Sequence, residues 1–409
     1  MRTVRPFAVL PLLLAGLALL VPAPAFADDD EAWVMDILRK YSPDGFHVVD
    51  EYMKKDPLDS DFMMFFHGDT EEDRWHSINT IVHEQAHGYM AAFGGYDSTS
   101  FYVDRILSVR VKHTEVFRTN RIVTTVPEAL RTFRFSYVDS DEETLGSQAE
   151  GAYGLLNEMA AYSVGSRAAY DLMAAYDAMG RTANWAGYLE NVDVTLYGIL
   201  EFRFFILRYL MFAKDREPKI YAGIVGNADF QKAFAAVDRK AAAFVEEYFK
   251  ARQDVFARLR AQGYKVEEDA EGIGLMKDGE GEYFGTFMDV YEMLRVEMAK
   301  PAYAPFLSAL YAGSAPAAYP EYARVAASYA GSTVVRVPAV PSAPAPRLPR
   351  HHRHPPPRPR RHQAPPLRPR RPVARVPAAR EAPPRVSAGP PATARATGSA
   401  ASSTWSGPR

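Results

Sequence analysis

The chain has 409 residues, 48 Lys and Arg against 50 Asp and Glu, and no cysteine. The lack of cysteine excludes disulfides, thiolate metal sites and cysteine nucleophiles. The net charge of −2 hides a division: residues 331–409 hold 15 arginines and one acid, whereas residues 28–330 hold 31 basic and 49 acidic residues, a net of −18. An acidic body long enough for a hydrophobic core therefore carries a basic tail.

The first 27 residues have the pattern of a cleaved secretory signal peptide. Arg2 and Arg5 precede a nearly continuous apolar run over 7–21, and residues 25–27 supply the small residues of a cleavage site. No later segment reaches the ~18–20 uncharged residues that a membrane span needs. We expect cleavage near Ala27, export to the periplasm or beyond the cell, and no transmembrane segment in the mature chain.

Apolar periodicity predicts an α+β body in which helices dominate. Residues 30–41 have helical spacing. Short apolar runs at 46–49 and 62–66 are typical of strands. Residues 74–93 again have helical spacing, with two glycines directly after them that form a suitable helix end.

The second half of the body is predicted from the same signals. β-Branched and aromatic residues in near alternation over 99–138 indicate two to four strands. Further helices are expected over 144–178, 185–214 and 228–262. Residues 272–284 have the pattern of a hairpin that turns at Asp278 and Gly279, after which helices resume to about Ala312.

The predicted helix over 74–93 contains the pattern His-Glu-x-x-His at His83, Glu84 and His87. Residues four apart lie on one face of an α-helix, so both imidazoles can bind one tetrahedral zinc ion. Glu84 is turned ~100° from His83. Its carboxylate is therefore placed beside the metal, where it can accept a proton from water. The pattern supplies two ligands and a base, and it requires a third ligand from elsewhere.

Glu158 is the leading candidate for that third ligand. It is the single acid in an apolar stretch of its predicted helix, and a charge there is costly unless it is paired or binds a metal. The small residues Ala160 and Ala161 would let another helix approach closely. Two rivals stay open: Glu150, on a different face of the same helix, and Glu201, in an aromatic helix further along.

His-Glu-x-x-His followed by a downstream helix with Asn-Glu-x-x-Ala resembles the gluzincin zinc metallopeptidases, such as the thermolysin-like enzymes and the zinc aminopeptidases. The resemblance covers about residues 80–165. It implies a mostly helical zincin-like body. The strands expected over 99–138 would form a small β-sheet inserted between the two metal-binding helices, in a gap longer than in compact gluzincins. The resemblance also implies that His83, His87 and Glu158 bind Zn²⁺ and that Glu84 is the catalytic general base.

Some positions match the gluzincin pattern and others depart from it. Asn157 matches the Asn before the ligand Glu, whereas Tyr162 stands where thermolysin-like enzymes have an Asp that orients a histidine. The aminopeptidase Gly-x-Met-Glu-Asn signature is absent. Met90 and Phe93 stand where metzincins need Gly and His, which excludes that class. Tyr162 is also our candidate for the catalytic donor to the developing oxyanion.

The leading hypothesis is an exported zinc peptidase that hydrolyses peptide or protein substrates. The tail supports an alternative, because residues 331–409 hold 19 of the 31 prolines and no lysine, a composition typical of disordered segments. Arg-rich sequence of this kind can bind an anionic polymer. The alternative is therefore a non-catalytic envelope-binding or polyanion-binding protein. The tail would also result from GC-rich DNA translated in a shifted frame.

Overall fold

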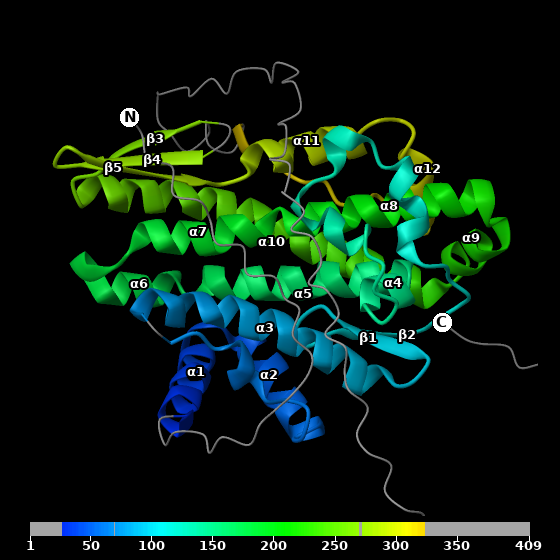
Figure 1. The fold of residues 1–409 in the computed structure, drawn as a ribbon, viewed down its shortest axis with the longest axis horizontal. Coiled ribbons are helices and arrows are strands. Elements are labelled where there is room, and N and C mark those ends of the chain that lie inside the picture. The colour runs from blue at the N-terminus through cyan, green and yellow to red at the C-terminus, as the bar shows by residue number, and fades with distance from the viewer. Residues whose placement is uncertain (1–26, 69, 270–271, 324–409) are drawn as a thin grey trace, which may run out of the picture. The chain divides into compact units, whose positions relative to one another are not determined.

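The helix that carries the His-Glu-x-x-His pattern, α3 (Glu71–Gly94), packs against α5 (Ala152–Asp171) (Figure 1). A capping box begins α3, in which Thr70 and Asp73 each accept a hydrogen bond from the other's backbone N–H. Gly95 ends it at φ 105°, a value that favours glycine. The helix predicted over 74–93 is confirmed and extends by one turn at its start.

The computed structural model describes residues 27–68, 70–269 and 272–323, which belong to one unit. Nearly every residue of α5 is buried. On its other sides α5 packs against α7 (Trp185–Leu196), α8 (Gly198–Arg216) and α10 (Ala228–Ala261). The close approach of α3 and α5 depends on Gly165, because a Cβ there would lie 3.0 Å from the Cβ of His83.

Shorter helices complete the described part of the body (Figure 1). They are α1 (Ala27–Tyr41), α2 (Pro43–Lys55), α4 (Gly146–Ala149), α6 (Met173–Met179), α9 (Pro218–Val225), α11 (Met288–Met298) and α12 (Ala304–Leu310). Within the described residues, no helix has the length and apolar character that crossing a bilayer requires.

Two small antiparallel sheets accompany the helices. One pairs β1 (Ser98–Tyr102) with β2 (Ser108–Lys112) and lies in sequence between α3 and α5. The other has the order β3 (Lys265–Glu268), β4 (Gly272–Lys277) and β5 (Glu280–Gly285). The prediction of a mainly helical α+β body with a small sheet between the two helices is confirmed, and so is the hairpin over 272–284.

The strand predictions for residues 46–49 and 62–66 are wrong. The first run lies within α2, and the second forms a 3₁₀ turn, η1 (Phe62–Phe65). Pro43 occupies the first turn of α2, where its fixed φ suits a helix. Short apolar runs do not distinguish a strand from one buried face of a helix, which explains the error.

The region over 99–138 contains two strands rather than up to four. Its second half forms three 3₁₀ turns, η2 (Thr119–Thr125), η3 (Glu128–Leu130) and η4 (Phe133–Tyr137). Buried aromatic residues in these turns contact α8, as Phe135 does with Phe205. The alternating apolar side chains of this segment therefore pack against a helix and do not belong to a strand.

Two long helix predictions are interrupted. The stretch over 144–178 divides into α4, α5 and α6, with Gly151 between the first two at φ 55°. The stretch over 185–214 divides at Tyr197, and the strand β3 and the helix α9 were not predicted. The helix opened by Asn227 is confirmed, with the Asn227 side chain accepting a hydrogen bond from the N–H of Phe230. The expected signal peptide and the tail after residue 330 lie outside the described residues, apart from Ala27.

Candidate metal centre

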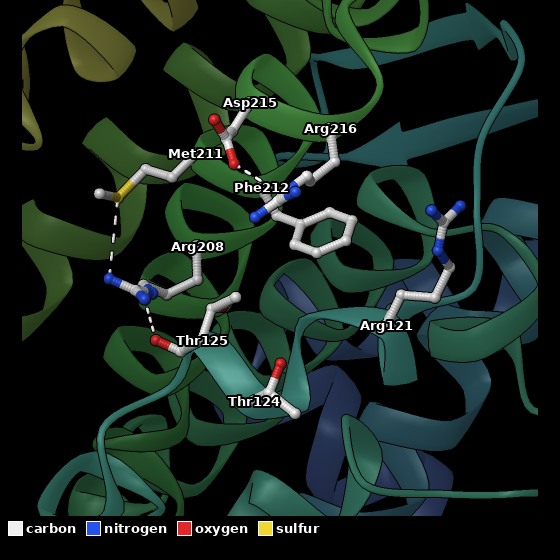
Figure 2. Close-up of a pocket in the computed structure, with 8 residues that line it drawn as sticks. All are labelled: Arg121, Thr124, Thr125, Arg208, Met211, Phe212, Asp215 and Arg216. Carbon is white, nitrogen blue, oxygen red and sulfur yellow. Dashed lines mark hydrogen bonds and ion pairs between the residues drawn. The ribbon is translucent and has the colours of Figure 1, made fainter.

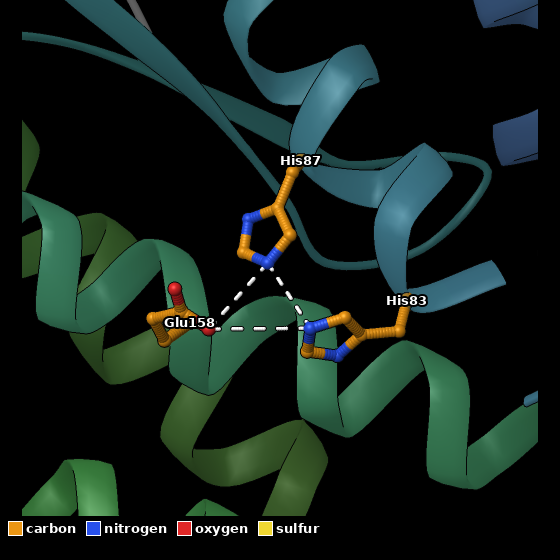
Figure 3. Close-up of side chains that lie close together, drawn as sticks. All are labelled: His83, His87 and Glu158. Carbon is orange, nitrogen blue, oxygen red and sulfur yellow. Dashed lines mark hydrogen bonds and ion pairs between the residues drawn. The ribbon is translucent and has the colours of Figure 1, made fainter. Parts of the chain in front are cut away.

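The His-Glu-x-x-His pattern and the acid from the second helix meet at one point. His83 and His87 lie one turn apart on α3, and Glu158 faces them from α5 (Figure 3). The two Nε2 atoms are 3.1 Å apart, and Oε2 of Glu158 lies 3.5 Å from Nε2 of His87 and 4.0 Å from Nε2 of His83. Ligands ~2.0–2.1 Å from a tetrahedral zinc ion are roughly 3.3 Å apart. The three side chains thus have nearly the spacing of a metal site.

The chemistry of these donors fits a divalent cation. Oε2 of Glu158 is buried and has no hydrogen-bond partner among the described residues, which is costly for a carboxylate oxygen. Nδ1 of His87 contacts the amide oxygen of Asn157. Because that oxygen only accepts, a neutral His87 ring carries its proton on Nδ1 and presents a lone pair at Nε2. A Zn²⁺ ion would satisfy these converging groups.

His83 is held differently from His87. The backbone carbonyl of Ala161 lies within hydrogen-bonding reach of the His83 imidazole. The Tyr162 ring meets the His83 ring edge-on, with centroids 4.4 Å apart and planes at 68°. A backbone carbonyl and an aromatic ring therefore lie around His83.

The two histidines have opposite pKa shifts. Burial lowers the pKa of His83 well below its ordinary value, and the charges of His87 and Arg134 lower it further. Burial also acts to lower the pKa of His87, but the carboxylates of Glu158 and Glu84 outweigh it and raise the pKa to about 9. His83 is therefore neutral at pH 7, whereas a proton and a metal ion compete for Nε2 of His87.

Glu84 lies beside the three ligand candidates. Burial raises its pKa, the nearby His87 lowers it, and Glu158 raises it further. A raised pKa brings a carboxylate closer to the value that suits a general base near neutral pH. The side chain of His87 is 27% exposed, compared with 11% for His83 and 9% for Glu158. Solvent therefore reaches the centre from the side of His87.

The structure separates Glu158 from its two rivals. Among the described residues, the group that could hold a metal ion contains Glu158 and neither Glu150 nor Glu201. Glu201 is fully buried and pairs with Arg134 at 2.7 Å, which satisfies its charge. Burial raises the pKa of Glu150, and the charge of His87 lowers it, so Glu150 lies in the same neighbourhood without joining the group.

Two residues near the centre were not identified from the sequence, Tyr137 and Arg134, both in η4. Burial raises the pKa of Tyr137, and the charges of Tyr162 and Glu158 and a hydrogen bond with Tyr162 raise it further. Arg134 had a usable signal, because it is a charge between Phe133 and Phe135 and so resembles Glu158 in its apolar surroundings.

A separate pocket of about 600 Å³ on the described surface contains none of these residues (Figure 2). Its arginines already have partners: Arg216 pairs with Asp215 at 2.8 Å, and Arg208 donates to the carbonyl of Thr125. The third arginine of the pocket, Arg121, pairs with Glu217. Arg121 and Arg216 are therefore balanced by acids, whereas Arg208 contacts a neutral carbonyl.

Comparisons of the whole chain with family models, with curated proteins and with solved structures found no match.

Proposed function

We propose that the protein is a zinc-dependent peptidase of the gluzincin type, exported after removal of its first 27 residues. The observation that carries the proposal is the convergence of His83, His87 and Glu158 from α3 and α5, with a buried carboxylate oxygen at the centre that faces both imidazoles and has no hydrogen bond. We also propose that the fold is zincin-like. Its support is the arrangement of the two helices and the match of the motif to the gluzincin pattern.

The chain's own residues have distinct roles in this chemistry. A Zn²⁺ ion bound by the three ligands would lower the pKa of a water molecule and polarise a peptide carbonyl. Glu84 accepts a proton from that water and passes it to the leaving amine. The Tyr162 hydroxyl donates to the carbonyl oxygen as negative charge develops there. Asn157 fixes the ring orientation of His87.

Metal content and peptide cleavage by the mature chain test the proposal. Purified wild-type protein should hold one zinc ion per chain by elemental analysis, and His83→Ala and Glu158→Ala should lose it. Glu84→Gln should keep the metal and cleave a peptide library roughly 10²–10⁴-fold more slowly, since it lacks the base. Glu71→Gln is the matched control, because it makes the same change at an exposed position of α3.

Two results would contradict the proposal. One is a wild-type chain without stoichiometric zinc after expression in zinc-containing medium. The other is a folded His83→Ala variant that retains the metal. Zinc binding with no cleavage of any peptide would leave the metal centre in place and overturn the peptidase activity.

A further inference from the structure

Arg134 is a buried arginine beside the candidate centre that the proposed chemistry does not use. The residue is 3% exposed, and its partner Glu201 is fully buried. Glu201 accepts one hydrogen bond from the backbone N–H of Arg134 at 2.9 Å and another from its Nη1 at 2.7 Å. Nη2 donates to the carbonyl of Val194 at 3.0 Å. Two polar contacts therefore fix the guanidinium within the core, and the third fixes the Arg134 backbone.

The guanidinium also lies between two aromatic rings. Its Cζ is 4.2 Å from the ring centroid of Tyr162 and 4.7 Å from that of Tyr197. Cations over aromatic faces at these distances are attracted to the ring. Because the Tyr162 ring in turn meets the His83 ring at 4.4 Å, contacts run without a gap from Glu201 to a ligand candidate.

The first residue of α8 makes room for this arrangement. A Cβ at Gly198 would lie 2.8 Å from Cζ of Arg134 and 3.1 Å from Cδ1 of Tyr162. Its φ is not positive, so the backbone itself does not require glycine. The close approach of the guanidinium and the phenol ring is therefore what excludes a side chain at this position.

Stability alone does not account for the pair. A buried ion pair is often no more stabilising than apolar residues of the same volume. Nε of Arg134 is also buried without a partner, which adds to the cost. A metal-binding histidine needs a fixed orientation, and His87 obtains it from Asn157. At His83 this support comes from the Ala161 carbonyl and from the Tyr162 ring, and Arg134 lies over the face of that ring.

We propose that Arg134 is a positioning residue of the metal centre, which holds the Tyr162 ring in place beside His83 and so keeps the His83 imidazole directed at His87. The inference rests on the proposed function, because it assumes that these histidines bind a metal. Arg134 acts through Tyr162 and contacts neither the metal nor the substrate. Glu201, a rival ligand in the sequence, serves here as the anchor of Arg134.

The test uses the mature full-length chain loaded with Co²⁺, whose visible absorption bands report the geometry of its ligands. The double variant Arg134→Gln/Glu201→Gln removes both buried charges together and keeps the side-chain volumes close to those of the wild type. Its bands should shift or weaken, and its zinc dissociation constant, measured against a chelator, should rise roughly 10–100-fold. Tyr162→Phe keeps the ring and should retain the wild-type bands, whereas Tyr162→Ala should lose them.

A matched control separates positioning from general destabilisation. Arg203 on α8 forms another buried pair with Asp238 at 3.0 Å, with side chains 6% and 0% exposed. Arg203→Gln/Asp238→Asn should lower the melting temperature and leave the cobalt bands unchanged. If the Arg134 double variant does not fold, Gly198→Ala decides, since one methyl group displaces the guanidinium or the ring without removing a charge.

The inference would be overturned if the folded double variant kept the wild-type cobalt bands and zinc affinity. If the double variant does not fold, the same result in Gly198→Ala would overturn it. Either result would leave the proposed function intact. Equal changes in the Arg203 control would also overturn it, because the effect would then be one of stability. A wild-type chain that binds neither metal would instead overturn the proposed function on which the inference rests.

Discussion

At the scale of single residues, two phenol groups stand beside the candidate ligands. Tyr137 is hydrogen-bonded to Tyr162, and the charge of Glu158 contributes to its raised pKa. The Tyr162 ring contacts Arg134, His83 and Phe202. A hydrogen bond between two phenols polarises both hydroxyl groups, which strengthens a further bond that one of them makes to a third group. This arrangement favours Tyr162 as the group that stabilises an oxyanion.

Removal of the two hydroxyl groups should therefore have unequal effects. Tyr162→Phe should lower kcat by roughly 10²–10³-fold, the loss typical of one oxyanion donor, with KM and zinc content little changed. Tyr137→Phe should cause a smaller loss of kcat, because it removes only the support of Tyr162. Steady-state kinetics on a cleaved peptide gives both values. The reverse order of the two effects would assign the donor to Tyr137.

The chemistry of the site was partly predictable from its residues. His83 and His87 are fixed by helix geometry, and Glu158 was found because an acid in an apolar helix needs a partner. Ala161 and its carbonyl could not be found in this way, since a backbone group leaves no trace in the residue type. Arg134 carried the same signal as Glu158 but lay in a segment predicted as a strand, which hid its relation to α5.

At the scale of elements, the hairpin of β1 and β2 is attached to α5 through His113. Nε2 of His113 is 2.9 Å from the hydroxyl of Thr99, and the ring stacks on Tyr153 of α5 with centroids 4.4 Å apart. Burial lowers the pKa of His113, and the nearby Asp97 opposes this in part. The folded state therefore favours a neutral imidazole at His113.

The stability of the protein should fall in acid because of His113. Since the pKa is lower in the folded state, the unfolded chain binds more protons once the pH drops through the ordinary value of about 6.5, and folding free energy is lost. His113→Gln can keep a contact to Thr99 and cannot titrate. Urea unfolding at pH 7.5 and 5.5 should show a larger loss in the wild type than in this variant. An equal loss in the two proteins would contradict the prediction.

The elements themselves were predicted unevenly, for physical reasons. Long amphipathic segments such as α3 and α10 have clear periodicity and capping residues, so their positions were found. Residues 116–137 form short 3₁₀ turns, and side chains such as Phe135 pack against α8. Such packing depends on a partner distant in sequence, which local propensity does not contain.

At the scale of the whole molecule, a metal ion would join the two helices around which the core is arranged. Binding to the folded state alone adds RT ln(1 + [L]/Kd) to its stability, which is about 2.7 kcal/mol at a hundredfold excess over Kd. For a body of this size, that corresponds to a change of roughly 5–10 °C in melting temperature. The metal is thus expected to contribute to the fold as well as to catalysis.

Chelation should reveal this contribution. A strong chelator should lower the melting temperature of the wild type by roughly 5–10 °C, and added zinc should restore it. His83→Ala should melt at one temperature under both conditions, because it has no metal to lose. Differential scanning calorimetry measures the effect. A wild type that does not respond to the chelator would show that the described fold is independent of metal.

The division of charge along the chain gives the last prediction. The body has a net charge of −18 and the tail one of +14, so binding to an anionic polymer should depend on the tail alone. The mature chain should be retained on a heparin column and elute at a salt concentration well above that for a chain ending at residue 330. Such binding releases counterions from the polymer, so the affinity falls steeply as the salt concentration rises. Equal retention of both chains would contradict the prediction, because the polymer would then bind the body, although both are negatively charged.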